Sequence, residues 1–194
     1  LTLWAKRSAW PSYESLERGL RLRELWVALK ELPPGRILFV RSGVPLVYGT
    51  EWWRAHTHVT ALVPMETGRA IVHGTFTHPS PVASFVYLGA SARRPVTGLA
   101  EQLDGQLLFG RPLETIEIER LDRLAAALGA SAVIALDEDA PKLGRLDQSA
   151  WFVRQPVAPP FAVYARRAPV VLPERLGPGH WRFTAWRPAG EWSS

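Results

Sequence analysis

The sequence predicts an α/β fold, in which a layered sheet carries packed helices and a C-terminal β-hairpin. Twice along the 194 residues, an amphipathic helix is followed by a tight turn and a short apolar strand, and the hydrophobic content of 47% suffices for a core. We expect strands at residues 37–40, 70–73 and 133–136 to share one sheet. Helices at residues 16–32 and 121–128 should pack on it.

The first helix–strand unit begins near residue 12. Leucines at helical spacing, with Glu and Arg between them, predict an amphipathic helix that ends at Leu32. The sequence Pro33-Pro34-Gly35 should end it, because proline disfavours helix in the residue before it and glycine permits a turn. The β-branched and aromatic run that follows, residues 36–40, predicts a buried strand.

The middle of the chain has a less regular pattern. Residues 42–67 are interrupted by Gly and Pro and are rich in Trp, His and Tyr, so we expect a long ordered excursion with a helical turn or more. A second strand is predicted at residues 69–74. The apolar run at residues 82–88 fits a strand or a helix, because periodicity cannot decide in so short a run. Residues 97–103 predict a short helix.

A second helix–strand unit begins near residue 118. Residues 118–128 place Leu and Ala on one helical face, and Gly129 stands where a left-handed C-terminal cap would be. A strand is predicted at residues 132–136. Residues 151–154 and 161–164 read as two further strands joined by a proline-rich turn, which predicts an antiparallel hairpin at the sheet edge.

Composition suggests where the first domain ends. After Arg167 the chain becomes rich in Pro and Gly, and an alternating run follows at residues 181–186. We therefore assign residues 1–167 to the α/β domain, and residues 168–194 to a linker and the first strand or strands of a second β domain. Because the chain begins at Leu1 and its single Met is Met65, we expect a piece of a longer polypeptide.

Charge and cysteine content narrow the function classes. The net charge of +5 comes mainly from Arg, but there is no Lys/Arg run and no zinc-finger spacing, so we expect no nucleic-acid partner. The chain has no Cys, which excludes disulfides, thiolate zinc sites and cysteine nucleophiles. No window reaches the roughly 18 apolar residues that a membrane span needs.

Four segments in a fixed order carry a resemblance to a known family. They are residues 35–39 (GRILF), residues 63–76 (VPMETGRAIVHGTF), the helix–strand unit at 121–135, and residues 161–164 (FAVY). This order resembles the extracytoplasmic domains of large bacterial and archaeal polytopic membrane proteins related to 6-pyruvoyl-tetrahydropterin synthase. These proteins are in turn similar to multi-spanning glycosyltransferases that use lipid-linked sugars. The departures are Ala70, where the family has Pro, and Ser131-Ala132, where an aromatic residue precedes the strand.

The resemblance implies a location and a role. It implies a domain on the extracytoplasmic face of the cell membrane, tethered by transmembrane helices outside this sequence. Its partners would be the membrane-embedded part of the same polypeptide and a lipid-linked sugar or acceptor. The family's catalytic acidic residue would lie upstream of Leu1, so this chain should hold no catalytic residue, metal or cofactor. The alternative function is a stand-alone carbohydrate-active or metal-dependent hydrolase.

An aromatic cluster in the irregular stretch is the main candidate for substrate binding. Aromatic rings can stack on a sugar while carboxylate and imidazole groups take its hydroxyls. The two tryptophans could instead fill the gap above the first strand. If the strands at 37–40 and 69–74 pair in parallel, the loops after them share one edge. The substrate-binding set is then Tyr48, Glu51, Trp52, Trp53, His56, His73 and His78.

Other constellations are weaker. The histidines from His56 to His78, with Glu51 and Glu66, could supply zinc ligands, but their spacing fits no zinc signature, and hydrogen-bonded loop histidines are the simpler interpretation. Asp137, Glu138 and Asp139 follow the strand at 132–136, where functional loops are common. They could form a carboxylate pair, although an exposed acidic turn is the commoner arrangement. No nucleophile elbow or phosphate-binding loop is present.

Overall fold

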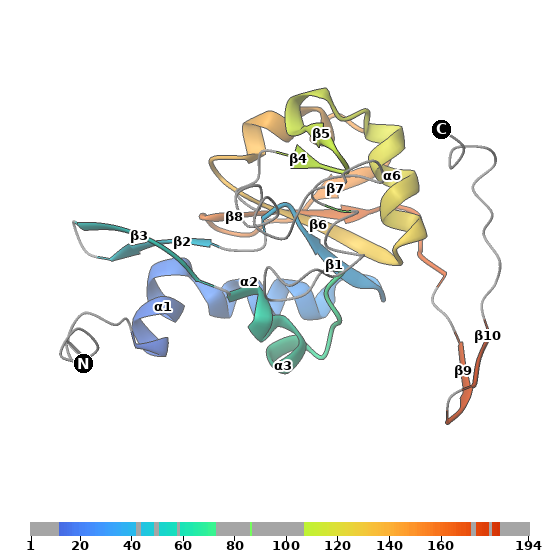
Figure 1. Ribbon diagram of the computed structural model, residues 1–194, viewed down its shortest axis with the longest axis horizontal. Helices are drawn as coiled ribbons and strands as arrows, with labels where there is room; N and C mark the ends of the chain where they lie inside the picture. The colour runs from blue at the N-terminus through green and yellow to red at the C-terminus, as the bar shows by residue number, and fades with distance from the viewer. Residues whose placement is uncertain are drawn as a thin grey trace, which may run out of the picture.

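A mixed four-stranded sheet with helices on both faces confirms the predicted α/β fold (Figure 1). The structure is a computed structural model that describes residues 12–41, 44–48, 51–57, 59–72, 86, 107–171, 174–178 and 180–182. Helices α1 and α2 lie below the sheet in Figure 1, and α6 lies above it. Within the described residues, no helix is long and apolar enough to cross a membrane.

The strand order in this sheet is β1-β6-β8-β7. Strand β1 (Arg36–Phe39) pairs in parallel with β6 (Ala130–Leu136), so these two predicted strands share one sheet, as expected. Strand β8 (Phe161–Arg166) is antiparallel to β6 and to β7 (Phe152–Arg154). The predicted C-terminal hairpin is therefore confirmed. Strand β7 is the outermost strand on this side of the sheet, and β8 lies between β7 and β6.

The third predicted strand, at residues 70–73, contributes a single residue pair. Ile71 forms an isolated parallel bridge with Ile37. The Ile37 amide donates to the Ala70 carbonyl oxygen at 2.9 Å, and the Val72 amide donates to the Ile37 carbonyl oxygen at 2.9 Å. This segment thus lies beside β1 as predicted, but in the described residues it forms a bridge rather than a ladder. The remainder of the predicted strand, from His73, lies outside the described residues.

The sheet is buried on both faces because its strands alternate between two apolar clusters. Ile37 and Ile134 pack with α1 and α2, whereas Leu38 and Val133 pack with α6. This alternation explains the continuous apolar runs at residues 37–39 of β1 and 132–136 of β6, since both faces of these strands are covered. The side of α1 and α2 also buries Trp26, Val59, Val63, Phe161 and Val163.

The predicted helix at residues 16–32 is two helices, α1 (Tyr13–Leu20) and α2 (Leu22–Glu31). Arg21 separates them in the left-handed conformation, with φ of 52°, and its amide donates to the Arg18 carbonyl oxygen at 3.4 Å. Leu20 and Leu22 are both buried. Two residues that are two positions apart point to different sides of a continuous helix. The break at Arg21 therefore allows both leucines to face the sheet.

The excursion at residues 42–67 contains a helical turn, as expected, and a hairpin that was not predicted. The hairpin joins β2 (Val44–Tyr48) to β3 (Glu51–Thr57), and Tyr48 is opposite Glu51 in its register. The turn of 3-10 helix η3 (Val59–Leu62) and the short helix α3 (Val63–Thr67) follow. The sequence signal for the hairpin is the Gly-Thr pair between Tyr48 and Glu51, since glycine followed by a polar residue is typical of two-residue hairpins.

The remaining elements include short pieces around the second helix–strand unit. Helix α6 (Ile118–Ala127) is followed by Gly129 with φ of 66°, which confirms the predicted left-handed glycine before β6. The short elements are β4 (Leu107–Leu108), β5 (Arg111–Pro112), η4 (Leu113–Thr115) and η5 (Ala140–Leu146). Strands β9 (Glu174–Gly177) and β10 (His180–Arg182) form a separate hairpin in the region predicted to begin a second domain.

Two segments with predicted structure lie mainly outside the described part of the chain. In the run at residues 82–88, whose type was left open, only Val86 is described; it is helical and buried. The helix predicted at residues 97–103 lies wholly outside the described residues. The domain boundary after residue 167 also stays a prediction.

Gly35 lies where two segments approach closely, and this yields a testable prediction. Its φ is +154°, and a Cβ atom there would touch the Ser131 side chain and lie 2.9 Å from the Ser131 amide nitrogen. We expect Gly35→Ala to lower the free energy of unfolding by about 1–3 kcal/mol, because overpacking forces the backbone to move. Gly144→Ala is the control: it meets nothing within 4 Å and should change the free energy by less than about 0.5 kcal/mol.

Urea denaturation measures both variants. Equal stability of the two would contradict the steric account. Ser131→Gly, added to Gly35→Ala, should restore part of the loss, because it removes the side chain that the new methyl group meets.

Candidate functional site

Three segments of the chain leave the sheet at the same edge. Strands β1 and β6 are parallel, and Ile71 pairs in parallel with Ile37. The residues after Phe39, after Leu136 and after Val72 therefore all begin at one side, which we call the carboxyl edge. In α/β sheets, ligands bind outside the carboxyl ends of parallel strands. This edge is the candidate functional site.

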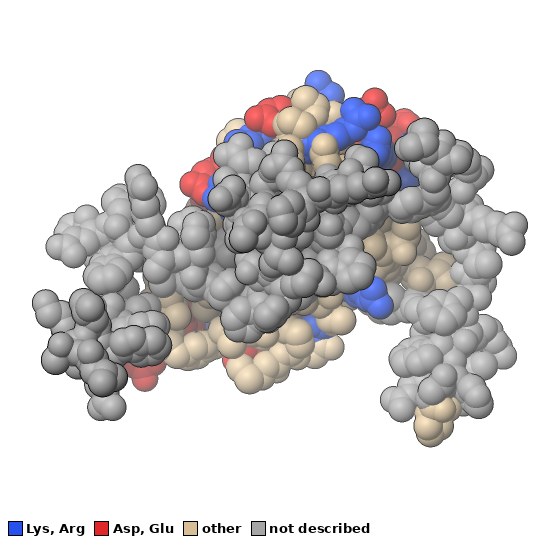
Figure 2. Space-filling model, viewed as in Figure 1, with Lys and Arg blue, Asp and Glu red and all other residues tan. Residues whose placement is uncertain are grey.

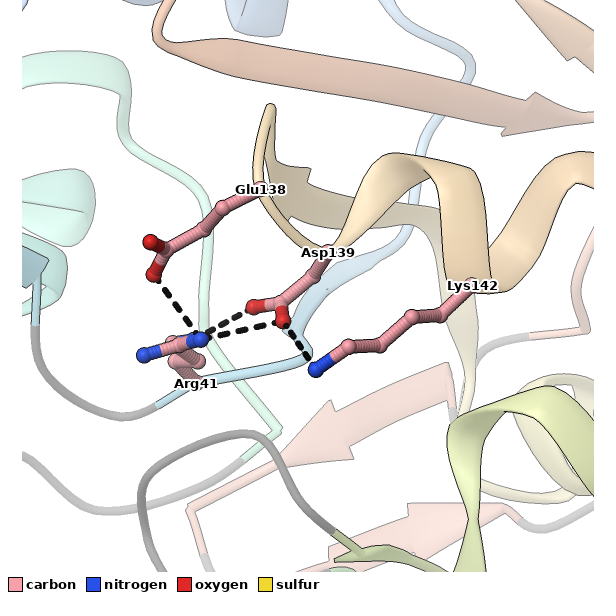
Figure 3. Close-up of polar contacts among 4 residues, drawn as sticks. All are labelled: Arg41, Glu138, Asp139 and Lys142. Carbon is pink, nitrogen blue, oxygen red and sulfur yellow. Dashed lines mark hydrogen bonds and ion pairs between the residues drawn. The ribbon is translucent and has the colours of Figure 1, made fainter.

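A charged cluster lies at the carboxyl edge (Figure 3). The carboxylate of Asp139 is fully buried and accepts hydrogen bonds from Arg41 Nε and Nη2, the latter at 3.0 Å. Lys142 Nζ donates to Asp139 Oδ1 at 3.1 Å. Glu138 Oε1 lies 2.8 Å from Arg41 Nη2. We call these four residues the Asp139 cluster.

Backbone hydrogen bonds place the members of the cluster. The Val40 amide donates to the Ile134 carbonyl oxygen at 2.8 Å, which brings Arg41 next to the end of β6. The Asp139 amide donates to the Leu136 carbonyl oxygen at 2.9 Å, which closes a tight turn after that strand. The Asp139 side chain lies between Arg41, which follows β1, and Lys142, which is in η5 (Figure 3). Two parallel strands thus bring together residues 98 positions apart.

The predicted exposed acidic turn is wrong for Asp139. Asp137 and Glu138 are exposed, as expected, but Asp139 is completely buried. A buried carboxylate is stable only where cations and donors compensate for the lost hydration. Arg41 and Lys142 supply that compensation here. The sequence does carry a signal for a buried ion pair here, since the charged residue Arg41 directly follows the apolar run at residues 37–40.

The geometry of the Asp139 cluster is that of a structural ion-pair network. Both oxygens of Asp139 accept hydrogen bonds from protein donors, and the cluster contains no hydroxyl or thiol that could act as a nucleophile. Among the described residues, no three His, Cys, Asp or Glu side chains converge as metal ligands. The cluster can therefore hold the edge in shape and present charge beside it.

The predicted substrate-binding residues belong to the loops that start at this edge. Tyr48, Glu51, Trp52, Trp53 and His56 are all in the β2–β3 hairpin, where Val47 is opposite Trp52 and Leu46 is opposite Trp53. Their side chains lie outside what the structure describes, as do His73 and His78. The pairing of Ile37 with Ile71 is parallel, which is the arrangement that a shared edge requires. The predicted common cleft itself stays a prediction.

Arg69 fixes the segment that leads to His73. Its guanidinium donates to the carbonyl oxygens of Pro33, at 2.7 Å, of Lys30, at 3.1 Å, and of Leu32. Carbonyl groups at the end of α2 have no partner within the helix, so this side chain caps it. Burial lowers the pKa of Arg69 from its ordinary value. The sequence did not predict that Arg69 caps this helix.

Basic and acidic side chains are intermixed at two other places on the described surface. In Figure 2, basic and acidic side chains lie side by side at the top of the molecule, where α6 and its neighbours lie in Figure 1. An open groove of about 740 Å³ lies at the junction of α1 and α2, and its described lining is also of mixed charge. Its lining residues are Glu14, Glu17, Arg18, Arg21, Arg23 and Glu24. No aromatic ring is among these described lining residues.

The fold and the site define a mixed α/β domain whose carboxyl edge carries a closed ion-pair network and an adjoining hairpin. Comparisons with protein-family models, with curated proteins and with solved structures found no match.

Proposed function

We propose that this chain is a non-catalytic accessory domain of a membrane-embedded glycosyltransferase-like protein, on the extracytoplasmic face of the membrane. Its partners are the membrane-embedded part of the same polypeptide and a lipid-linked sugar or acceptor. The observation that supports a binding role is the parallel course of β1, β6 and Ile71. Because of these parallel pairings, the segment that leads to the β2–β3 hairpin and the segment after Val72 both leave the sheet at the carboxyl edge.

The residue types in these loops suit a sugar ligand. Tyr48, Trp52 and Trp53 offer aromatic rings, which stack on the apolar face of a pyranose. Glu51, His56, His73 and His78 offer acceptors and donors for ring hydroxyls. A loop that contributes only a connection has no need of this composition, and binding residues concentrate on loops carried by a rigid sheet.

The Asp139 cluster supports a non-catalytic role. It places two carboxylates at the edge where an α/β enzyme would hold its catalytic groups, and both are paired with Arg41. Asp139 is also shielded from solvent. An acid or base must reach the proton that it transfers, and a buried carboxylate held on both oxygens cannot do so without opening the cluster.

A vesicle-binding experiment tests the proposal. The chain should bind vesicles that contain a polyprenyl-phosphate-linked hexose more tightly than vesicles without it. Trp52→Ala and Glu51→Ala should each weaken that binding by about tenfold, the factor that corresponds to about 1.4 kcal/mol. Trp151→Ala is the matched control, because Trp151 is an exposed tryptophan that precedes β7, at the opposite edge of the sheet. Equal loss in all three variants, or no preference for the sugar lipid, would contradict the proposal.

Two further observations separate the proposal from the hydrolase alternative. The reading frame that encodes this chain should also encode several apolar spans of about 20 residues. In that full-length protein, Glu51→Ala or His73→Ala should impair function without lowering the melting temperature of the domain. Hydrolysis of glycosides or esters by the chain alone, abolished by one His or Asp substitution, would support the alternative instead.

A further inference from the structure

We infer that Asp139 is a positioning residue for the β2–β3 hairpin, which it holds through Arg41. The structural part of this inference concerns only the described backbone of the hairpin. Its consequence for ligand binding rests on the proposed function.

The first root of the hairpin is held by the Asp139 cluster. Beyond the end of β1, the Val40 amide still donates to the Ile134 carbonyl oxygen of β6. Arg41 is the next residue, and its side chain is only 14% exposed. Two of its donors reach Asp139, and one of them also reaches Glu138. The ion pairs thus extend the attachment of this chain segment beyond the end of the ladder, three positions before Val44.

The second root is held by burial. Thr57 is opposite Val44 at the base of the hairpin. Two residues later, Val59 and Thr60 are buried, 3% and 0% exposed. Helix α1 also lies beside β2. A hairpin whose two roots are fixed can place the residues near its tip, from Tyr48 to Trp53, reproducibly relative to the sheet.

The chemistry of the pair suits positioning better than stabilisation. A buried ion pair is often no more stabilising than apolar residues of the same volume, but it does impose a direction. The planar guanidinium binds a carboxylate through two parallel hydrogen bonds, and this geometry fixes the orientation of both side chains. Lys142 binds the same Asp139 carboxylate from η5. The carboxylate therefore joins the end of β1 to the start of η5 in one orientation.

Hydrogen exchange in the whole chain tests the inference. Asp139→Asn keeps the shape of the side chain and removes its charge. Amides of residues 44–57 should then exchange faster by about tenfold or more, because the guanidinium loses its buried counterion, keeps only the exposed Glu138, and the root opens. Arg41→Lys should act in the same direction, because an ammonium group cannot form the two parallel bonds. Amides of residues 130–136 should keep their protection.

The matched control is a second buried ion pair, at the opposite edge of the sheet. Arg166 Nε donates to Asp122 Oδ1 at 2.6 Å, and the two side chains are 4% and 13% exposed. Arg166 is opposite Phe152, the first residue of β7. Asp122→Asn should therefore lower stability without accelerating exchange in the hairpin selectively. Asp139→Glu, which keeps the carboxylate, should restore part of the protection that Asp139→Asn loses.

The outcomes are distinct. Selective acceleration in the hairpin for Asp139→Asn and Arg41→Lys supports the inference. Unchanged hairpin exchange, or equal acceleration by Asp122→Asn, overturns it. If Asp139→Asn does not fold, Arg41→Lys and Lys142→Gln give the same reading. If hairpin exchange responds as expected but the wild-type chain does not bind polyprenyl-phosphate-hexose vesicles, the proposed function fails and the positioning role stands.

Discussion

Replacing Asp122 with Ala is expected to lower the free energy of unfolding by about 3–5 kcal/mol, because it leaves the buried charge of Arg166 without its partner. Arg166 ends β8, and its side chain is only 4% exposed. Its Nη1 atom is already buried without a hydrogen-bond partner within the described structure. The Nε–Oδ1 bond of 2.6 Å to Asp122 is therefore the main compensation for this charge.

A double replacement separates the cost of an unpaired charge from the net value of the pair. Asp122→Leu with Arg166→Met keeps similar volume and removes both charges, and it should recover most of the stability lost in Asp122→Ala. Urea denaturation with linear extrapolation measures each variant. If Asp122→Ala lowered the free energy of unfolding by less than about 1 kcal/mol, the value typical of solvent-exposed ion pairs, the result would contradict the buried position of this pair.

Replacing Ile134 with Ala is expected to lower the free energy of unfolding by about 2–5 kcal/mol, since it removes buried methyl groups and leaves a cavity. Ile134 lies in β6, with β1 on one side and β8 on the other, and it is 1% exposed. It belongs to the apolar cluster of α1 and α2. The neighbours of a side chain in the middle of the sheet cannot move far enough to fill the cavity that the truncation leaves.

Graded and exposed substitutions serve as controls for this effect. Ile134→Val removes one methyl group and should cost about 0.5–1.5 kcal/mol. Val27→Ala, on the 53% exposed side chain of α2, should stay within about 0.5 kcal/mol of the wild type. Thermal and urea unfolding check all three. If Ile134→Ala were as mild as Val27→Ala, the central position of β6 would be wrong.

The elements predicted best are those with long local patterns. Four apolar residues of α2, at positions 22, 25, 26 and 29, have the spacing of one helical face, and these four are buried. Residues 37–39 of β1 and 132–136 of β6 are apolar without interruption and are buried in the sheet. The glycine after α6 was also placed correctly. In each case the signal and the structure that it specifies span the same few residues.

The features that were missed depend on more than one segment. The break falls at Arg21 itself, two residues after Gly19, and it follows from the need to bury both Leu20 and Leu22 against one sheet. The β2–β3 hairpin has a weak signal, because aromatic residues lie at the neighbouring positions Trp52 and Trp53 and interrupt the alternation of a strand. In the described part of the strand predicted at residues 70–73, up to Val72, the pairing with β1 is the single bridge of Ile71 with Ile37.

The candidate site divides in the same way. The sequence by itself determined the class of fold, the type of its long elements and the composition of the loops at the carboxyl edge, because hydrophobic spacing and turn chemistry are local properties. Only the tertiary structure decided that Asp139 is buried and that Arg41 is its partner. The two residues are 98 positions apart, and it is the parallel pairing of β1 with β6 that brings a carboxylate and a guanidinium together. Each charge is tolerated inside the protein because the other lies beside it.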